Sequence, residues 1–168
     1  MIIKVFQKQN RKKVCVLLFI IFLCVIVANV INSYAIHSVV GTSMNSSIYS
    51  HNKVLVNKAG ALNRYSIIAY RDDSTSDMYI KRIIGCPGDK IVIQNNVLIL
   101  SLNSTNPFED IIKIKLMPNI SEKLEKYSEL PKGCYFVLGD NLKVSKDSRY
   151  IGLISQEDIE GNVEYIWK

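Results

Sequence analysis

Histidine is scarce in this chain, and nothing in the sequence resembles a metal site. There are two histidines among 168 residues, and the four cysteines form neither a CxxC pair nor a cluster with histidine. Zinc sites need such clusters, so we expect no metal and no cofactor. His37 follows a long apolar segment, and His51 lies in a polar Tyr-Ser-His-Asn stretch typical of a surface turn. A Ser–His–Asp triad stays an alternative, but no motif around either histidine supports it.

Acidic residues are absent from residues 1–13, which carry five of the 21 lysines and arginines. Residues 14–31 have no charge, so residues 32–168 hold the other 16 basic side chains and all 15 acidic ones. A basic balance often indicates a nucleic-acid partner, but a nearly neutral domain offers no phosphate-binding face. We therefore expect no nucleic-acid binding.

The uncharged residues 14–31 are almost all apolar. As a helix they would be about 27 Å long at ~1.5 Å per residue, which is enough to cross a bilayer. The alternative is a cleavable signal peptide with Ser33-Tyr34-Ala35 at its cleavage site, but the run exceeds the usual ~7–15 apolar residues. We expect an uncleaved, single-pass anchor in the cell membrane. Because basic residues precede it, residues 1–13 should be cytoplasmic and residues 32–168 extracytoplasmic.

Two cysteines fall inside this span and two lie beyond it. Cys15 and Cys24 should behave as small apolar side chains. Cys86 and Cys134 lie where oxidation is possible, but their spacing alone does not support a disulfide. We expect free buried thiols, with a disulfide as the alternative.

Short runs of β-type composition recur through residues 32–168, and we find no internal repeat. Gln94-Asn95-Asn96 separates two of these runs and predicts a hairpin turn, because Asn tolerates positive φ. We expect a mainly antiparallel β domain of about 130 residues, large enough for its own core. The predicted strands cover residues 53–57, 67–70, 78–84, 90–93, 97–100, 111–116, 134–138 and 161–166.

One stretch has helical periodicity. Ile120, Leu124 and Tyr127 fall on one helical face, Ser121 is placed to cap its start, and Pro131 stops the chain soon afterwards. The rest of residues 101–131 is polar, and we expect an insertion or excursion from the main sheet.

A serine nucleophile needs a base, and lysine can supply one. Ser43 stands in a Gly-Thr-Ser-Met run, and its hydroxyl is a weak nucleophile at neutral pH. Lys81 can accept a proton only when it is neutral, a state that burial favours by penalising the charged form. The isoleucines around Lys81 in a β-type run are consistent with such burial. By residue type alone, however, Lys81 and Arg82 are more commonly solvated strand charges.

Three segments together carry a family resemblance. The first is residues 41–44, and the second is Lys81-Arg82-Ile83-Ile84-Gly85-Cys86-Pro87-Gly88-Asp89. The third is Gly139-Asp140-Asn141, followed by Ser145, Asp147, Ser148, Arg149 and Gly152. In order, spacing and position after the anchor, they resemble bacterial type I signal peptidases, the membrane-anchored Ser–Lys serine proteases of peptidase family S26. The resemblance covers residues 1 to about 165. It implies antiparallel sheets of the signal peptidase/LexA-like β-fold, preceded by one N-terminal transmembrane helix.

The resemblance also implies a role for each matching residue. Ser43 would attack the scissile carbonyl, and neutral Lys81 would take its proton and return it to the leaving amine. Ser145 would hydrogen-bond the lysine amine and orient it. Asp147 and Arg149 would pair and brace the loop that carries Ser145.

Two further expectations concern the oxyanion and the substrate. The backbone N–H of Ser43 would donate to the oxyanion. Some relatives have a serine two residues before the nucleophile as a second donor, whereas this chain has Gly41. Met44 would either line the first substrate pocket or simply fill the core.

The implied partners are the signal peptides of exported preproteins, the lipid bilayer and the nearby Sec export machinery. An extended peptide would bind beside a sheet edge, with small pockets that read an Ala-x-Ala site. Self-cleaving repressors share the dyad and the β-fold but are soluble, so the apolar span argues against them. Eukaryotic-type signal peptidases carry histidine at the lysine position, so Lys81 argues against that branch.

The chain departs from the family pattern in three places. Ser46-Ser47 stand where Pro-Thr is usual, so a rigid turn beside the nucleophile is lost. Arg64-Tyr65-Ser66-Ile67-Ile68 replaces Arg-Gly-Asp and an apolar strand, and Leu142 and Val144 replace polar residues of the third segment. These changes suggest a divergent peptidase and leave two alternatives open. One is an accessory Ser–Lys maturation protease with a dedicated substrate, and the other is an inactive paralogue that binds signal peptides.

Overall fold

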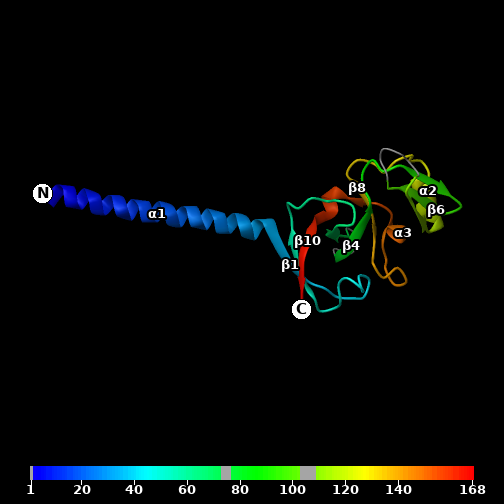
Figure 1. Ribbon diagram of the computed structural model, residues 1–168, viewed down its shortest axis with the longest axis horizontal. Helices are drawn as coiled ribbons and strands as arrows, with labels where there is room; N and C mark the ends of the chain where they lie inside the picture. The colour runs from blue at the N-terminus through cyan, green and yellow to red at the C-terminus, as the bar shows by residue number, and fades with distance from the viewer. Residues whose placement is uncertain (1, 73–76, 103–108) are drawn as a thin grey trace. The chain divides into compact units, whose positions relative to one another are not determined.

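The computed structural model describes residues 2–72, 77–102 and 109–168, and the chain divides into two compact units, Met1–Ala35 and Ile36–Lys168. Helix α1 (Ile2–Ser33) makes up most of the first unit (Figure 1). Within α1, Cys15–Ser33 has a mean hydropathy of 2.9 over 19 residues, so it is long and apolar enough to cross a membrane. The predicted anchor, residues 14–31, lies in this helix.

The second unit is built from antiparallel strands in two sheets (Figure 1). The seven-stranded sheet has the order β1-β2-β10-β3-β4-β8-β9, and the three-stranded sheet has the order β5-β6-β7. Among the residues that the structure describes, three short helical segments lie between strands: α2 (Pro118–Leu124), α3 (Ser148–Ile151) and the 3-10 helix η1 (Gln156–Asp158). The strands of the larger sheet are β1 (Tyr34–Ser38), β2 (Lys53–Asn57), β3 (Ile67–Arg71), β4 (Met78–Gly85), β8 (Cys134–Leu138), β9 (Ile154–Ser155) and β10 (Ile159–Trp167), and those of the smaller are β5 (Ile91–Gln94), β6 (Val97–Ser101) and β7 (Ile111–Lys115).

The predicted fold class, mainly antiparallel β after one N-terminal helix, is confirmed. Each of the eight predicted strands forms with ends within about two residues of the prediction, whereas β1, β9 and α3 were not predicted. Asn95 and Asn96 join β5 to β6 with φ of 51° and 59°, and Gln94 pairs with Val97. Two successive positive φ values define the tight turn that suits a two-residue hairpin.

Strand β8 separates two core clusters because its side chains alternate between the two faces of the sheet. Phe136 packs with the apolar side chains of the smaller sheet and α2, while Tyr135 and Val137 pack with Ile68 and Ile83 of β3 and β4. The central strands are therefore fixed by burial on both faces. Strand β4 carries Lys81, and the segment with Ser145 follows β8.

The predicted helix start is wrong. Ser121 does not cap α2; it is buried inside the helix, which begins at Pro118 after Met117. Proline suits the first helical position because its fixed φ is helical and its missing N–H has no partner there. Ile120 and Leu124 do face the core, as predicted. The excursion from the main sheet includes β5 and β6 as well, so it starts earlier than residue 101.

Candidate active site

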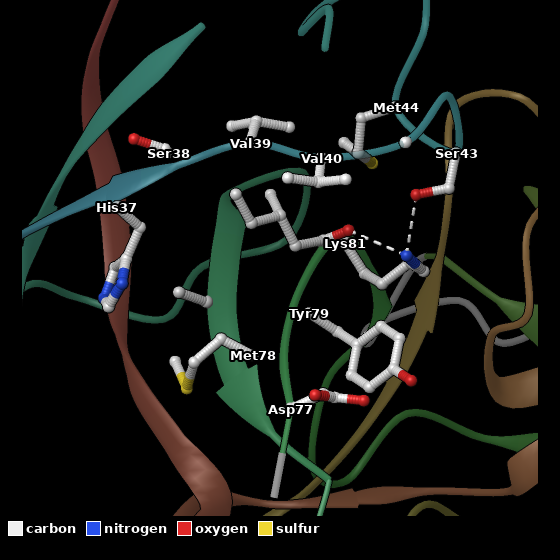
Figure 2. A pocket seen from close by; sticks show the side chains of 13 residues that line it. His37, Ser38, Val39, Val40, Ser43, Met44, Asp77, Met78, Tyr79 and Lys81 are labelled. Atoms are coloured by element: carbon white, nitrogen blue, oxygen red, sulfur yellow. Dashed lines mark hydrogen bonds between the residues drawn. The ribbon is translucent and has the colours of Figure 1, made fainter. Parts of the chain in front are cut away.

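Ser43 and Lys81, 38 residues apart in the sequence, meet in the structure. The Nζ of Lys81 lies 2.9 Å from the Oγ of Ser43 (Figure 2). Lys81 projects from β4, and Ser43 lies in the turn that follows Gly41, whose φ of 98° favours glycine. The distance is within hydrogen-bond reach, so a proton can pass directly between the two side chains.

The turn that carries Ser43 is fixed at both ends. On one side, the Val39 N–H donates to Asn52 O at 2.8 Å, and the His51 N–H donates back to Val39 O at 2.9 Å. On the other side, Ile48 is fully buried and its N–H donates to Met44 O at 2.9 Å. The position of Ser43 is therefore determined by packing and backbone bonds on both sides.

Lys81 is buried rather than solvated. It is 2 % exposed, it pairs in register with Ile68 of β3, and its amine lies 5.6 Å from the centre of the Tyr79 ring. The amine also donates to Ile80 O at 2.9 Å. Burial lowers the pKa of Lys81 from 10.5 to about 8, against the opposing effect of the Asp147 charge. A substantial fraction of Lys81 is thus neutral near pH 8, as a general base requires.

The hydrogen bond expected from Ser145 to the lysine amine is absent. Ser145 is buried, but its Oγ has no hydrogen-bond partner. The hydroxyl instead lies against the Cα of Gly139, so closely that a Cβ there would overlap it. The Lys81 amine is directed to Ser43 and Ile80. The structure therefore places Ser145 against Gly139, with no hydrogen bond between its hydroxyl and the Lys81 amine.

Asp147 and Arg149 form the expected pair. The Nε and Nη2 of Arg149 donate to the two carboxylate oxygens of Asp147 at 2.8 Å and 3.0 Å, and Asp147 is fully buried. Arg149 also donates to Leu142 O at 2.8 Å, and the Gly139 N–H donates to Asp147 at 3.1 Å. These bonds join the two ends of the loop between residues 139 and 149.

A second pair was not assigned a role from the sequence. The guanidinium of Arg82 binds both oxygens of Asp140 at 2.8 Å and 2.7 Å, and it also donates to Tyr65 O at 2.8 Å. Burial acts to raise the pKa of Asp140, but the hydrogen bonds and charge of Arg82 oppose it, and that pKa is held below its ordinary value. Asn141 follows directly, and its N–H donates to Ser43 O at 2.9 Å. The lysine strand is thereby connected to the segment that contacts the nucleophile.

Arg64 holds the end of the lysine segment in the same manner. It binds both carboxylate oxygens of Asp89 at 2.8 Å and 2.6 Å and donates to Ile84 O at 2.7 Å. Asp89 in turn accepts from the Cys86 N–H at 2.6 Å. Since each arginine is far from its aspartate in the sequence, no local pattern could have predicted these two pairs.

An open groove of about 410 Å³ runs from the dyad along β4. Figure 2 shows Val39 and Val40 along one side, Met78 and Tyr79 along the other, and Ser43 with Lys81 at one end. Met44 lines the groove and is 2 % exposed, so it is both part of the core and part of the groove wall. The groove extends from Ser43 and Lys81 to His37, a form suited to an extended peptide chain.

The histidines take no part in the dyad. His37 lines the far end of the groove (Figure 2), and its Nε2 pairs with the Glu160 carboxylate at 2.5 Å. His51 is exposed in the turn between Ser50 and Asn52, with φ of 70°. In the described residues, neither histidine is hydrogen-bonded to a serine. The Ser–His–Asp alternative thus gains no support.

Cys86 and Cys134 are free thiols, both partly buried. Burial raises the pKa of Cys86 above its ordinary value. Within residues 13–72, 77–102 and 109–168, no cluster of histidine, cysteine and carboxylate side chains could hold a metal ion.

Comparison with known proteins gives consistent relatives. The profile of the family described as "Signal peptidase, peptidase S26" matches residues 11–168. Signal peptidase IB of Staphylococcus aureus is 34 % identical over 147 residues, which cover 77 % of this chain and 75 % of that protein. Signal peptidase I of Bacillus caldolyticus is 31 % identical over 169 residues, covering 94 % of this chain and 92 % of that protein. A crystal structure of a signal peptidase I from Enterococcus faecalis aligns with 61 % of this chain and 96 % of its own, at 25 % identity and a TM-score of 0.42.

Proposed function

Because the chain belongs to the signal peptidase family, peptidase S26, we propose that it is a membrane-anchored serine endopeptidase that removes signal peptides from exported preproteins. Ser43 is the nucleophile and Lys81 the general base in this proposal. The observation that carries the assignment of the dyad is the 2.9 Å contact between the Ser43 hydroxyl and a lysine amine that is 2 % exposed.

The chemistry follows from the protonation of the lysine. Neutral Lys81 accepts the Ser43 proton as the serine oxygen attacks the scissile carbonyl. The resulting ammonium then gives that proton to the leaving amine as the peptide bond breaks, which leaves an acyl-enzyme on Ser43. A water molecule, deprotonated by the again neutral Lys81, attacks the ester, and the amine returns the proton to the serine oxygen.

The negative charge that develops on the carbonyl oxygen needs a donor. The backbone N–H of Ser43 is the candidate, since it makes no hydrogen bond within the described part of the chain. Gly41 has no side chain to provide a second donor. The proposed oxyanion site therefore relies on backbone N–H groups in the turn around the nucleophile.

The groove suits an extended substrate. Strand β4 pairs with β8 through Arg82, Ile83 and Gly85, so its first half, Met78–Lys81, extends beyond that ladder. An extended peptide could add backbone hydrogen bonds to this half of β4, with side chains alternating into and out of the groove. Met44 would then narrow the pocket next to Ser43 and favour small residues such as alanine before the cleaved bond.

The location of the reaction follows from the charges around the span. Residues before the span are basic, and such segments stay in the cytoplasm. We propose that the unit from Ile36 onward is extracytoplasmic, where exported preproteins emerge. Proximity to the Sec machinery is part of the same proposal, because its products would be the substrates.

One experiment tests the proposal directly. Detergent-solubilised full-length protein is incubated with a preprotein carrying an Ala-x-Ala site, beside matched Ser43→Ala, Lys81→Ala and His37→Ala variants. We expect cleavage by the wild type and the His37 variant and none by the other two. Persistent cleavage by Lys81→Ala would exclude lysine as the base. A wild type that cleaves no preprotein would favour the dedicated-substrate or binding-only alternatives.

A further inference from the structure

The turn after the nucleophile has a backbone conformation that proline cannot adopt. Ser46 has a φ of 103°, in the region that favours glycine, and it is not a glycine. A non-glycine residue in this region costs about 1 kcal/mol or more, and it persists only where surrounding contacts hold it. Proline would require a φ near −65°. The Ser46-Ser47 pair therefore builds a different turn from the one that a proline at position 46 would impose.

Beside its own backbone bonds, this turn is held by a side-chain contact of the next residue, Ser47. The Oγ of Ser47 accepts a hydrogen bond from the Nη2 of Arg82 at 3.0 Å. Arg82 is in turn joined to Asp140 by two bonds of 2.8 Å and 2.7 Å. Ser47 is exposed, but its partner Arg82 is charged and partly buried. Hydrogen bonds to charged groups are stronger than neutral ones.

Arg82, which bonds Ser47, and Asp140, which bonds Arg82, are adjacent to the two halves of the dyad. Arg82 directly follows the base, Lys81, on β4. Asp140 directly precedes Asn141, which donates to Ser43 O at 2.9 Å and, through its side chain, to Thr42 O at 3.2 Å. Ser47 thus joins the nucleophile turn directly to the strand of the base, and, through the Arg82–Asp140 pair, to the segment that contacts the nucleophile backbone.

We propose that Ser47 is a positioning residue that sets the Ser43 hydroxyl against the Lys81 amine, in place of a rigid proline turn. This role of Ser47 rests on the proposed function, because the rates that test it are those of the proposed nucleophile, Ser43. Ser47 touches neither the substrate nor the reacting atoms; it acts by fixing where the turn sits relative to β4. In this view, the hydrogen bond of Ser47 restrains the turn in this chain, whereas a rigid proline restrains it in the usual family pattern.

The test compares five full-length proteins: wild type, Ser47→Ala, Ser47→Thr, Ser46→Pro and Ser128→Ala. Ser128 is an exposed loop serine outside the site and serves as the matched control. Each protein is assayed for kcat and KM on an Ala-x-Ala peptide across pH 6–9. The rate of Ser43 acylation by an activated ester is followed by mass spectrometry, which reports on the dyad without any preprotein.

For Ser47→Ala we expect kcat and the acylation rate to fall about tenfold with KM unchanged, because small misplacements of reacting atoms are costly. Ser47→Thr keeps the hydroxyl and should retain the wild-type rate, and Ser46→Pro should lose at least as much as Ser47→Ala. The midpoint of the pH profile should stay near that of the wild type, since Lys81 remains buried.

Two results would overturn the inference. The first is a wild-type acylation rate in Ser47→Ala or Ser46→Pro. The second is a slower Ser47→Ala whose pH midpoint rises, because water would then have reached Lys81 and the effect would be general loosening. Acylation without preprotein cleavage by the wild type would instead count against the proposed substrate and leave the role of Ser47 measurable.

Discussion

Replacing Lys81 with methionine separates the energetic cost of burying the lysine from its catalytic use. The side chains are similar in length, but methionine carries no charge and fits an apolar site. Burial lowers the pKa of Lys81 from 10.5 to about 8. At ~1.36 kcal/mol per pKa unit, burying the charged amine lowers the free energy of unfolding by about 3 kcal/mol.

The direction of the pH dependence follows from the lowered pKa. Between pH 8 and 10.5 the unfolded chain binds more protons at this position than the folded chain does, so wild-type stability rises with pH across that window. Below pH 8 both states are charged and the full cost is present. Lys81→Met removes this cost, but it also removes the bonds to Ser43 Oγ and Ile80 O, worth about 1 kcal/mol each. The variant should therefore be about 1 kcal/mol more stable than the wild type at pH 7 and about 2 kcal/mol less stable near pH 10.5.

The assay is urea unfolding of both detergent-solubilised proteins, followed by circular dichroism from pH 7 to 10.5. Other titrating groups are shared, so they cancel in the difference between the two proteins. Cleavage by Lys81→Met should fall by at least about 10²-fold, because the base is lost. A stability difference that does not vary with pH would refute the reasoning, since it would mean that Lys81 is not charged at a cost in the folded state.

Three other predictions follow from the site. The wild-type kcat/KM should rise about tenfold per pH unit and level off above pH 8, because only neutral Lys81 accepts the serine proton. If stopped cleavage assays place the midpoint of this pH profile near pH 10, the burial of Lys81 is contradicted. Gly139→Ala should lower kcat about 10²-fold, since a Cβ there would lie 2.6 Å from Ser43 O and displace the nucleophile, and an unchanged kcat would argue against that close approach. Arg149→Met should lower the free energy of unfolding by about 3 kcal/mol at pH 7, measured by urea unfolding, because fully buried Asp147 would lose its charged partner. Lys113→Met, at an exposed lysine, is the control. A smaller loss of stability in Arg149→Met than in this control would contradict a stabilising role of the Asp147–Arg149 pair.

The strands were predictable because their signal is local. Runs of β-branched and aromatic residues mark β2, β4 and β8, and the Asn95-Asn96 pair marks a tight turn. Strand β9 has two residues, too few for any pattern, and β1 begins directly after the apolar helix, with no turn residues to separate the two elements. The start of α2 was missed because Ser121 was weighed as a cap, although Pro118 marks the first turn.

The candidate site divides in the same way. Ser43 and Lys81 could be named from motif order, and the structure brings their side chains to 2.9 Å. The Ser145 hydroxyl could be named too, but its direction depends on a backbone contact with Gly139 that no sequence pattern encodes. The pairs made by Arg64 and Arg82 depend on which strands and turns become neighbours.

The sequence by itself determined the apolar span, the antiparallel β composition and the residue types that a lysine-dependent serine protease needs, because each is written in consecutive residues. Only the tertiary structure decided that Lys81 is buried and therefore neutral in part near pH 8, since its burial comes from Ile68 and other side chains on separate strands. It also decided that Arg82 donates to Ser47 in the turn after Ser43, because the fold brings β4 to that turn across 35 residues of the chain.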